Sequence, residues 1–368
     1  MILPVNYLKI PFLNEALIIK FAPRNKTIMR SLAIFFAFLF LSITASSQFA
    51  TRKVSKKEQA YTDSLKQVNY DYIFPVLGQK AYKAGFDIPY PIGIMANFIV
   101  MDQGLLMNNM QLGLTTDNLD IPLTNVDNLI TFGDNTNKSF AYNFRPDIWV
   151  FPFLNVYGLF GAGRSETTVK LTAPIEMTSV VDQGIRTTGV GVMGAFGVGP
   201  VWVSLDGNWT WNKPELLDKA VGVAVFGVRI GHTFVFDQHP DRNIAIWGGG
   251  MRVKMESNTV GQIRLGDAVP VEDMNAKGME LTAVWDGLTP AEKLDPTNIL
   301  MKAVGDRLVV ADGDAIIKYG MDKQVLQEWN AIFGAQFQLN KRWMLRTEWG
   351  LIGDRKSALA SINYRFLL

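Results

Sequence analysis

The chain has 368 residues and no cysteine, and its 36 lysines and arginines nearly balance its 34 aspartates and glutamates. A net charge of +2 gives no reason to expect a nucleic-acid partner, and the lack of cysteine excludes disulfides, thiol nucleophiles and Cys-ligated zinc. The 32 glycines and the aromatic share of 11% are typical of a sheet-rich envelope protein and are high for a soluble enzyme.

The N-terminal segment predicts export. Lys26 and Arg30 precede an apolar run over residues 32–41, which is too short to cross a bilayer as a helix. Small residues follow this run, and Ala45 and Ser47 have the spacing of a cleavage site for a secretory signal peptide.

We therefore expect residues 1–47 to be a signal peptide that is removed before Gln48. If Met29 is the true start, residues 1–28 are an over-extension; a retained N-terminal anchor is the alternative. No later segment offers the roughly 18 apolar residues of a transmembrane helix. The exported chain is therefore either soluble in the periplasm or a barrel.

Residues 48–88 are predicted to form an N-terminal periplasmic arm with a short helix over residues 56–68. From residue 89 to 368 the hydrophobic pattern has period 2. In the last strand Ile362 and Phe366 share one face, while Asn363 and Arg365 share the other. The length, number and aromatic ends of such strands indicate a transmembrane antiparallel β-barrel in residues 89–368.

The pattern predicts about ten strands. They are expected over residues 92–100 (continuing to 114 if unbroken), 139–149, 154–172, 188–197, 201–211, 221–236, 243–256, 329–339, 343–351 and 358–368. Splitting the first strand at residues 102–104 and adding one near 118–132 would give twelve. An even number is expected because both chain ends should lie in the periplasm.

The predicted connections differ in length. Tight turns are expected at residues 151–152, 199–200, 237–241 and 340–341, and long links at 115–138, 173–187, 212–220 and 257–327. Short turns belong to the periplasmic side and long loops to the exterior. The insert 257–327 carries helix signals at Pro290 and Pro296, which predict helices over 291–294 and 297–304 that cap the surface or enter the mouth.

Two motifs that could carry chemistry have plainer interpretations. Gly189, Gly191 and Gly194 match a dinucleotide-binding pattern, but period 2 continues through them and no helix follows. His232 counts onto the lipid-facing side of its strand, and His239 lies in a turn. Two histidines without a paired serine or acid form neither a hydrolase centre nor a metal site.

The polar faces of the strands carry charges that should line the lumen. These are Arg145, Asp147, Asp206, Arg229, Arg252, Lys254, Glu256, Arg346, Glu348 and Arg365. A barrel of this size is only about wide enough for side chains to fill, so the charges must pair. A structural ion-pair core is the favoured interpretation, and a path for small polar or anionic solutes is the functional alternative.

Three short stretches carry a resemblance. The strand–turn–strand over residues 145–161, with Pro152 in its turn, resembles that of uncharacterised outer-membrane β-barrel proteins, and the junction at Gln48 resembles the signal sequences of Bacteroidetes-type bacteria. The ending from Arg355 to Phe366 is similar to closing strands that the barrel-insertion machinery reads, although Leu367 and Leu368 follow it. The resemblance implies no catalytic residues.

The sequence thus predicts an outer-membrane protein surrounded by lipid. Its function is expected to be a narrow channel or transporter for small polar or anionic solutes, or that of a structural barrel. A membrane-embedded hydrolase of lipid or lipopolysaccharide is one alternative, and a surface-binding or adhesion module acting through residues 257–327 is another. No catalytic, cofactor or metal site is predicted.

Overall fold

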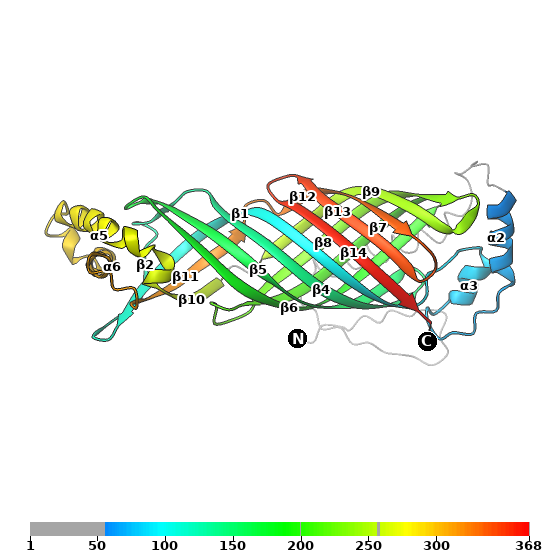
Figure 1. The fold of residues 1–368 in the computed structure, drawn as a ribbon, viewed down its shortest axis with the longest axis horizontal. Helices are drawn as coiled ribbons and strands as arrows, with labels where there is room; N and C mark the ends of the chain where they lie inside the picture. Colours follow the sequence, from blue (N-terminus) through cyan, green and yellow to red (C-terminus); the bar gives the residue numbers. More distant parts are fainter. Residues whose placement is uncertain (1–55, 199, 256–257, 368) are drawn as a thin grey trace, which may run out of the picture. The chain divides into compact units, whose positions relative to one another are not determined.

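The structure, a computed structural model, describes residues 56–198, 200–255 and 258–367, so the predicted leader lies outside the described residues. Ten antiparallel strands close into a barrel (Figure 1). The wall strands are β1 (Ile92–Thr116), β4 (Asn135–Phe151), β5 (Leu154–Ala173), β6 (Met177–Val198), β7 (Val201–Pro214), β8 (Val221–Phe236), β9 (His239–Met255), β12 (Trp329–Gln338), β13 (Trp343–Ile352) and β14 (Lys356–Phe366). The barrel closes because Ile92 of β1 pairs with Ile148 of β4 on one side and with Phe366 of β14 on the other.

The predicted count of ten strands is confirmed, and the division into twelve is wrong. β1 runs unbroken through residues 102–104, because each of these residues pairs with β4. The segment 118–132 forms only β2 (Leu119–Asn125) and β3 (Thr131–Phe132), which are short extensions beside the wall. The long link predicted over 173–187 is also wrong, since β5 and β6 remain paired as far as Leu171 and Met177.

Large apolar side chains on the outer surface form a belt around the barrel. On β7 the exposed residues run from Val201 to Trp211. This length matches the roughly 9–11 residues with which a tilted strand crosses a membrane. β5 and β6 have 20 and 22 residues. These two strands therefore extend well beyond the belt, toward the end of the barrel that carries the long connections.

The wall changes its strands part of the way along β1. The β13–β14 hairpin ends beside Gly104, whose backbone N–H donates to Asp354 Oδ2 at 2.8 Å. Beyond that level β11 (Ile316–Val325) pairs with β1 in its place, starting at Leu105 opposite Val325. β10 (Asn258–Arg264) pairs with β11 and continues the wall. Part of the predicted outer loop is therefore barrel wall.

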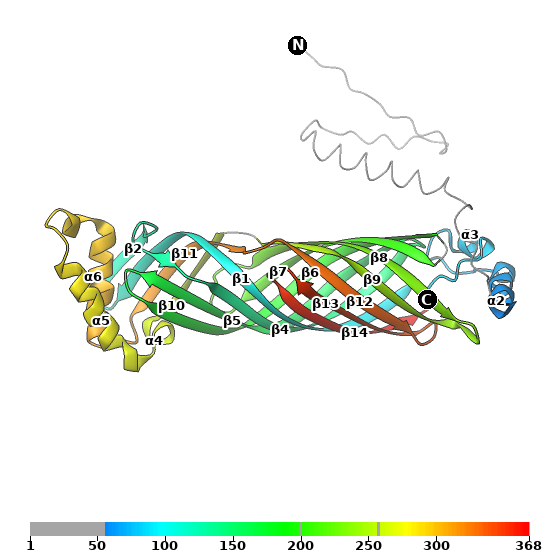
Figure 2. The same cartoon turned by 90° about the horizontal axis from the view of Figure 1, so that it is seen from above.

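The remainder of the insert is a helical cap. It contains α4 (Leu265–Ala268), α5 (Val271–Asp286), the short 3₁₀ helix η1 (Glu292–Leu294) and α6 (Pro296–Val309) (Figures 1 and 2). α6 starts where expected, because the Asp295 side chain accepts a hydrogen bond from the Thr297 backbone N–H at 2.8 Å. α5 was not expected. Met274, Leu300 and Leu308 of the cap pack in one core with Leu114 of β1.

The N-terminal arm docks against the short-turn end of the barrel (Figure 2). It contains α2 (Lys56–Gln67), close to the expected range, and α3 (Gly78–Lys83). Asp87 accepts a hydrogen bond from Tyr61 Oη at 2.7 Å and pairs with Lys341 of the β12–β13 turn at 3.2 Å. None of the described helices is long and apolar enough to span a bilayer.

The tip of the β13–β14 hairpin requires glycine. Gly353 has φ +121°, and a Cβ there would overlap Asn330. We expect Gly353→Ala to lower the free energy of unfolding by about 1–3 kcal/mol through backbone strain. Gly248→Ala is the control, because the nearest atom to its new methyl group would be a Phe333 ring carbon at an ordinary 3.7 Å. Denaturant titration of the refolded variants measures both, and equal stabilities would contradict the strained geometry.

Docking of the arm should weaken at high pH. Burial and the charge of Asp87 raise the pKa of Tyr61. A raised pKa in the docked state means that the stabilisation is complete below the undocked value of about 10 and is lost as the pH rises above it. Limited proteolysis between pH 8 and pH 11 should show the arm becoming sensitive near the top of that range. Tyr61→Phe should reduce this dependence, and an unchanged profile would contradict the assignment.

Candidate functional site

Four charged residues fill the lumen toward the short-turn end, and we call Asp206, Arg229, Arg346 and Glu348 the charge cluster. Arg229 lies at its centre: Nε donates to Glu348 Oε2 at 2.7 Å, Nη2 donates to Glu348 Oε1 at 3.0 Å, and Nη1 contacts Asp206. The Arg229 and Glu348 side chains are each 9% exposed. A guanidinium between two carboxylates satisfies charges that could not be buried singly.

Glu348 joins three wall strands to the charge cluster. Besides binding Arg229 of β8, it accepts hydrogen bonds from Arg346 Nη2 at 3.0 Å and from Trp247 Nε1 of β9 at 2.9 Å. The Arg346 guanidinium also lies 4.8 Å from the centre of the Trp247 ring. The hydrogen bonds of this carboxylate therefore fix the side chains that fill the centre of the lumen.

A second buried ion pair lies closer to the short turns. Arg365 Nη2 donates to Asp147 Oδ1 at 2.8 Å, and Asn155 donates to the same oxygen at 2.7 Å. Arg365 also donates to the backbone carbonyls of Tyr90 at 2.7 Å and Pro91 at 3.2 Å. The pair joins β14 to β4 across β1, which closes the barrel seam from inside.

Glycines that face inward leave the space these side chains need. A Cβ on Gly93 would lie 2.7 Å from Arg365 Nη1, and one on Gly191 would collide with the ring of Tyr157. That ring in turn supports Arg145, whose guanidinium carbon lies 3.7 Å from the ring centre. Gly191 belongs to the glycine pattern that resembles a dinucleotide loop. In this structure its missing side chain leaves space for the ring of Tyr157.

Seven of the ten predicted lumen charges face inward: Arg145, Asp147, Asp206, Arg229, Arg346, Glu348 and Arg365. Six of them form the charge cluster and the Arg365–Asp147 pair, and Arg145 lies on the ring of Tyr157, so period 2 identified most of the interior charge. Glu256 lies outside the described residues.

The placement of Arg252 and Lys254 in the lumen is wrong. Both are exposed on the outer face of β9, and Arg252 pairs with Glu328 at 2.7 Å. Their neighbours Met251 and Val253 line the lumen instead. Arg252 pairs across the sheet with Trp329, at the edge of the apolar belt, where the outer surface can carry charge.

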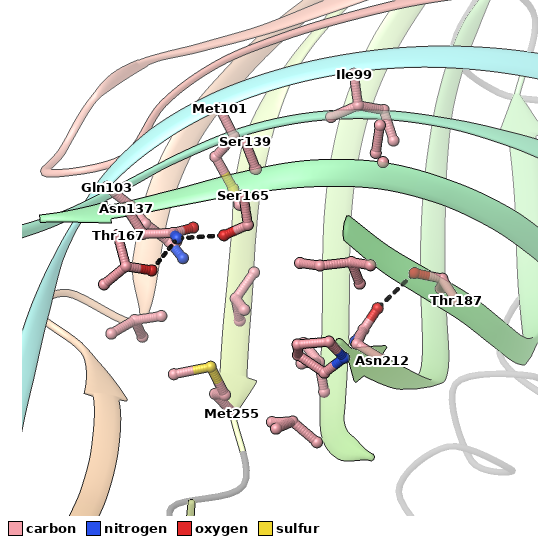
Figure 3. Close-up of a pocket in the computed structure, with 18 of the residues that line it drawn as sticks. Ile99, Met101, Gln103, Asn137, Ser139, Ser165, Thr167, Thr187, Asn212 and Met255 are labelled. Atoms are coloured by element: carbon pink, nitrogen blue, oxygen red, sulfur yellow. Dashed lines mark hydrogen bonds between the residues drawn. The ribbon is translucent and has the colours of Figure 1, made fainter. Parts of the chain in front are cut away.

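Beyond the charge cluster the lumen contains a cavity of about 620 Å³ (Figure 3), which we call the lumen cavity. Its volume is in the range of about 300–1,000 Å³ that is usual for small-molecule sites. Most of its lining is apolar, and nine of the fifteen methionines contribute to it. Methionine side chains adapt to varied apolar shapes, so this lining suits a flexible apolar ligand.

The polar groups on the cavity wall largely satisfy one another. Asn137 donates to Ser165 Oγ at 2.6 Å and to Thr167 Oγ1 at 3.0 Å, and Thr187 Oγ1 donates to Asn212 Oδ1 at 2.7 Å (Figure 3). Polar groups that already have partners in the protein do not need hydrogen bonds from a ligand. At the far end the cavity meets the underside of the cap, where Met110 and Ile317 belong both to its lining and to the cap core.

Two cations that line the cavity were missed in the sequence. Lys323 lies on β11 and Arg355 follows the β13–β14 turn. The alternation signal was present for both, because Lys323 continues the face of Tyr319 and Met321, and Arg355 continues the face of Arg365. The sequence pattern predicts a loop for the segment of Lys323 and a turn for that of Arg355, so neither residue is assigned to the lumen from the sequence.

Neither histidine belongs to this site. His232 lies on the outer face of β8 with its ring 4.4 Å from that of Phe234, and His239 is exposed beside the β8–β9 turn. Within the described residues no group of His, Asp and Glu could hold a metal ion.

No protein-family model and no curated protein matches the sequence. Among solved structures, similarity is found to the β domain of the Bordetella autotransporter Brka (9% identity, 75% of this chain and 100% of that chain, TM-score 0.34). It is also found to the outer membrane protein OprG from Pseudomonas aeruginosa (9%, 77% and 100%, TM-score 0.32) and to the translocator domain of autotransporter NalP from Neisseria meningitidis (11%, 78% and 92%, TM-score 0.32). The resemblance to a Bacteroidetes-type family stays a prediction.

The charge cluster should dominate the stability of the barrel. Glu348→Ala would leave Arg346 without an acidic partner and Arg229 with only Asp206, which we expect to lower the free energy of unfolding by about 3–5 kcal/mol. The matched control is Trp349→Phe on the outer face of the same strand, which should cost much less. Folding titrations in detergent measure both. Similar losses would contradict the inward placement of Glu348.

Proposed function

We propose that the protein is an outer-membrane barrel that receives a small, mainly apolar molecule in the lumen cavity. The observation that carries this proposal is a cavity of about 620 Å³ with an apolar lining between a closed charge cluster and a helical cap. Binding of an apolar ligand to such a surface is favourable, because the ligand displaces water from it.

The proposal includes an orientation and a location. The apolar belt supports insertion into a bilayer, and the short turns fit the periplasmic side. On this assignment the arm is periplasmic, the cap faces the exterior, and the cavity receives its ligand from outside or from the outer half of the membrane. Outer-membrane lipid and the machinery that reads the C-terminal strand are the partners that this location implies.

The ion pairs favour this role over an open path for small anions. A selective path needs charges that are free to exchange partners with the solute. Arg229, Arg346 and Arg365 are each bound to a carboxylate, and leaving those contacts would expose buried charge. We therefore expect the refolded protein to show no steady ion conductance in a planar bilayer.

Single cysteines test occupancy of the cavity, because the native chain has none. Met101 lines the cavity, and Asp102 on the same strand faces outward. In lipid nanodiscs, dodecanol should slow the reaction of Met101→Cys with N-ethylmaleimide by at least about fivefold, through steric exclusion, and leave Asp102→Cys unchanged.

Three results would overturn the proposal. Equal rates at Met101→Cys with and without dodecanol would show that the cavity takes no apolar ligand. Complete resistance of Met101→Cys to the reagent would favour a purely structural barrel. Steady anion-selective conductance would return the lumen to the channel interpretation.

A further inference from the structure

Arg355 is an arginine buried in the barrel at the point where the wall changes its strands. It is 1% exposed and lines the lumen cavity. The hairpin tip that carries it is fixed on two sides: Asp354 accepts from the Gly104 backbone N–H at 2.8 Å, and Asn330 donates to the Arg355 carbonyl at 2.7 Å. The guanidinium is therefore positioned by the fold.

The contacts of this guanidinium are neutral and incomplete. Nε donates to Gln103 Oε1 at 3.0 Å and Nη2 donates to the Gln327 carbonyl at 3.3 Å, while the buried Nη1 has no hydrogen-bond partner. The adjacent carboxylate of Asp354 attracts Arg355 electrostatically, but it accepts a hydrogen bond from β1, and no direct hydrogen bond or ion pair joins it to the guanidinium. A buried cation without a directly bonded counter-ion is costly, and an anion that reaches it would reduce that cost.

A second cation lies on the same wall. Lys323 also lines the cavity, and it pairs across the sheet with Met107, four residues beyond Gln103 on β1. That separation is roughly 13 Å along the strand. The long side chains of Arg355 and Lys323 can therefore both reach one ligand between them. Among the described residues no ion pair or hydrogen bond of its ammonium group is found. The carboxylates that line the cavity from inside, Asp206 and Glu348, are both bound to Arg229.

We propose that Arg355, supported by Lys323, binds the anionic head group of an amphiphile whose apolar chain occupies the methionine-lined part of the lumen cavity. The inference rests on the proposed function and names its ligand class: a single-chain molecule with one carboxylate or similarly charged oxyanion head. Nη1 supplies the free donor, Lys323 supplies a second positive charge, and the apolar lining excludes ions that lack a chain.

The test compares ligands that differ only in the head or the chain. Dodecanoate, dodecanol and acetate are applied to Met101→Cys in nanodiscs, and protection from N-ethylmaleimide gives the apparent affinity of each. Dodecanoate should bind about 10- to 100-fold more tightly than dodecanol, as a charge-assisted hydrogen bond implies. Acetate should not protect.

Variants locate the head group. Arg355→Gln in the Met101→Cys background should remove most of the advantage of dodecanoate and leave dodecanol unchanged, while Arg355→Lys should retain part of it. Lys356→Gln is the matched control, because this neighbouring lysine points outward and donates to the carbonyls of Leu351 and Gly353. Heat-dependent mobility on a denaturing gel shows which variants have folded, and Lys323→Gln gives a second measurement if Arg355→Gln does not fold.

The outcomes separate this inference from the proposed function. If neither dodecanol nor dodecanoate protects Met101→Cys, the cavity itself is not a binding site and both fail. If the two protect equally, or if Arg355→Gln and Lys323→Gln leave the preference for dodecanoate intact, the cavity binds apolar ligands and the head-group assignment is wrong. Protection by acetate would overturn the requirement for a chain.

Discussion

The barrel depends on the neutralisation of charge inside a narrow lumen. Arg229 can occupy the centre of the barrel only because Asp206 and Glu348 reach it from β7 and β13. β7 and β8 are paired neighbours, but β13 lies beyond β9 and β12 in the wall, so this one guanidinium fixes the position of β13 relative to the β7–β8 hairpin. The glycines and aromatic rings around it follow from the same constraint, since planar groups that stack this closely need neighbours without side chains.

Packing the charges at one end leaves the other end of the lumen without filler. The strands that continue past the charge cluster turn methionine, valine and small polar side chains inward, and these do not meet at the centre. The cap then lies over a hollow instead of a solid core. The charge cluster at one end, the apolar cavity wall and the helical cap at the other end are therefore consequences of where the sequence concentrates its interior charge. In this apolar setting Arg355 is a cation without a directly bonded carboxylate.

Much of this could be predicted from the sequence, because the period of a strand is exactly two residues and an inward face stays inward along its length. The ten wall strands and the inward position of Glu348 followed from that rule. It failed at Arg252 and Lys254 because a charged face does not by itself mark the lumen: the outer face of β9 also carries charge at the edge of the apolar belt. The cavity could not be predicted, since empty space depends on how far opposite side chains reach.

The change of strands along β1 has a consequence for how the insert could be engineered. β10 and β11 belong to the wall, but the backbone N–H of Leu265 donates to the carbonyl of Ala315 at 2.8 Å, and that of Gly266 donates to Gly313 at 3.1 Å. The two chain ends that lead into the helices therefore meet at a neck. The helices between them form a detachable module, which a short turn could replace without cutting a strand, whereas excision of the whole segment 257–327 would breach the barrel.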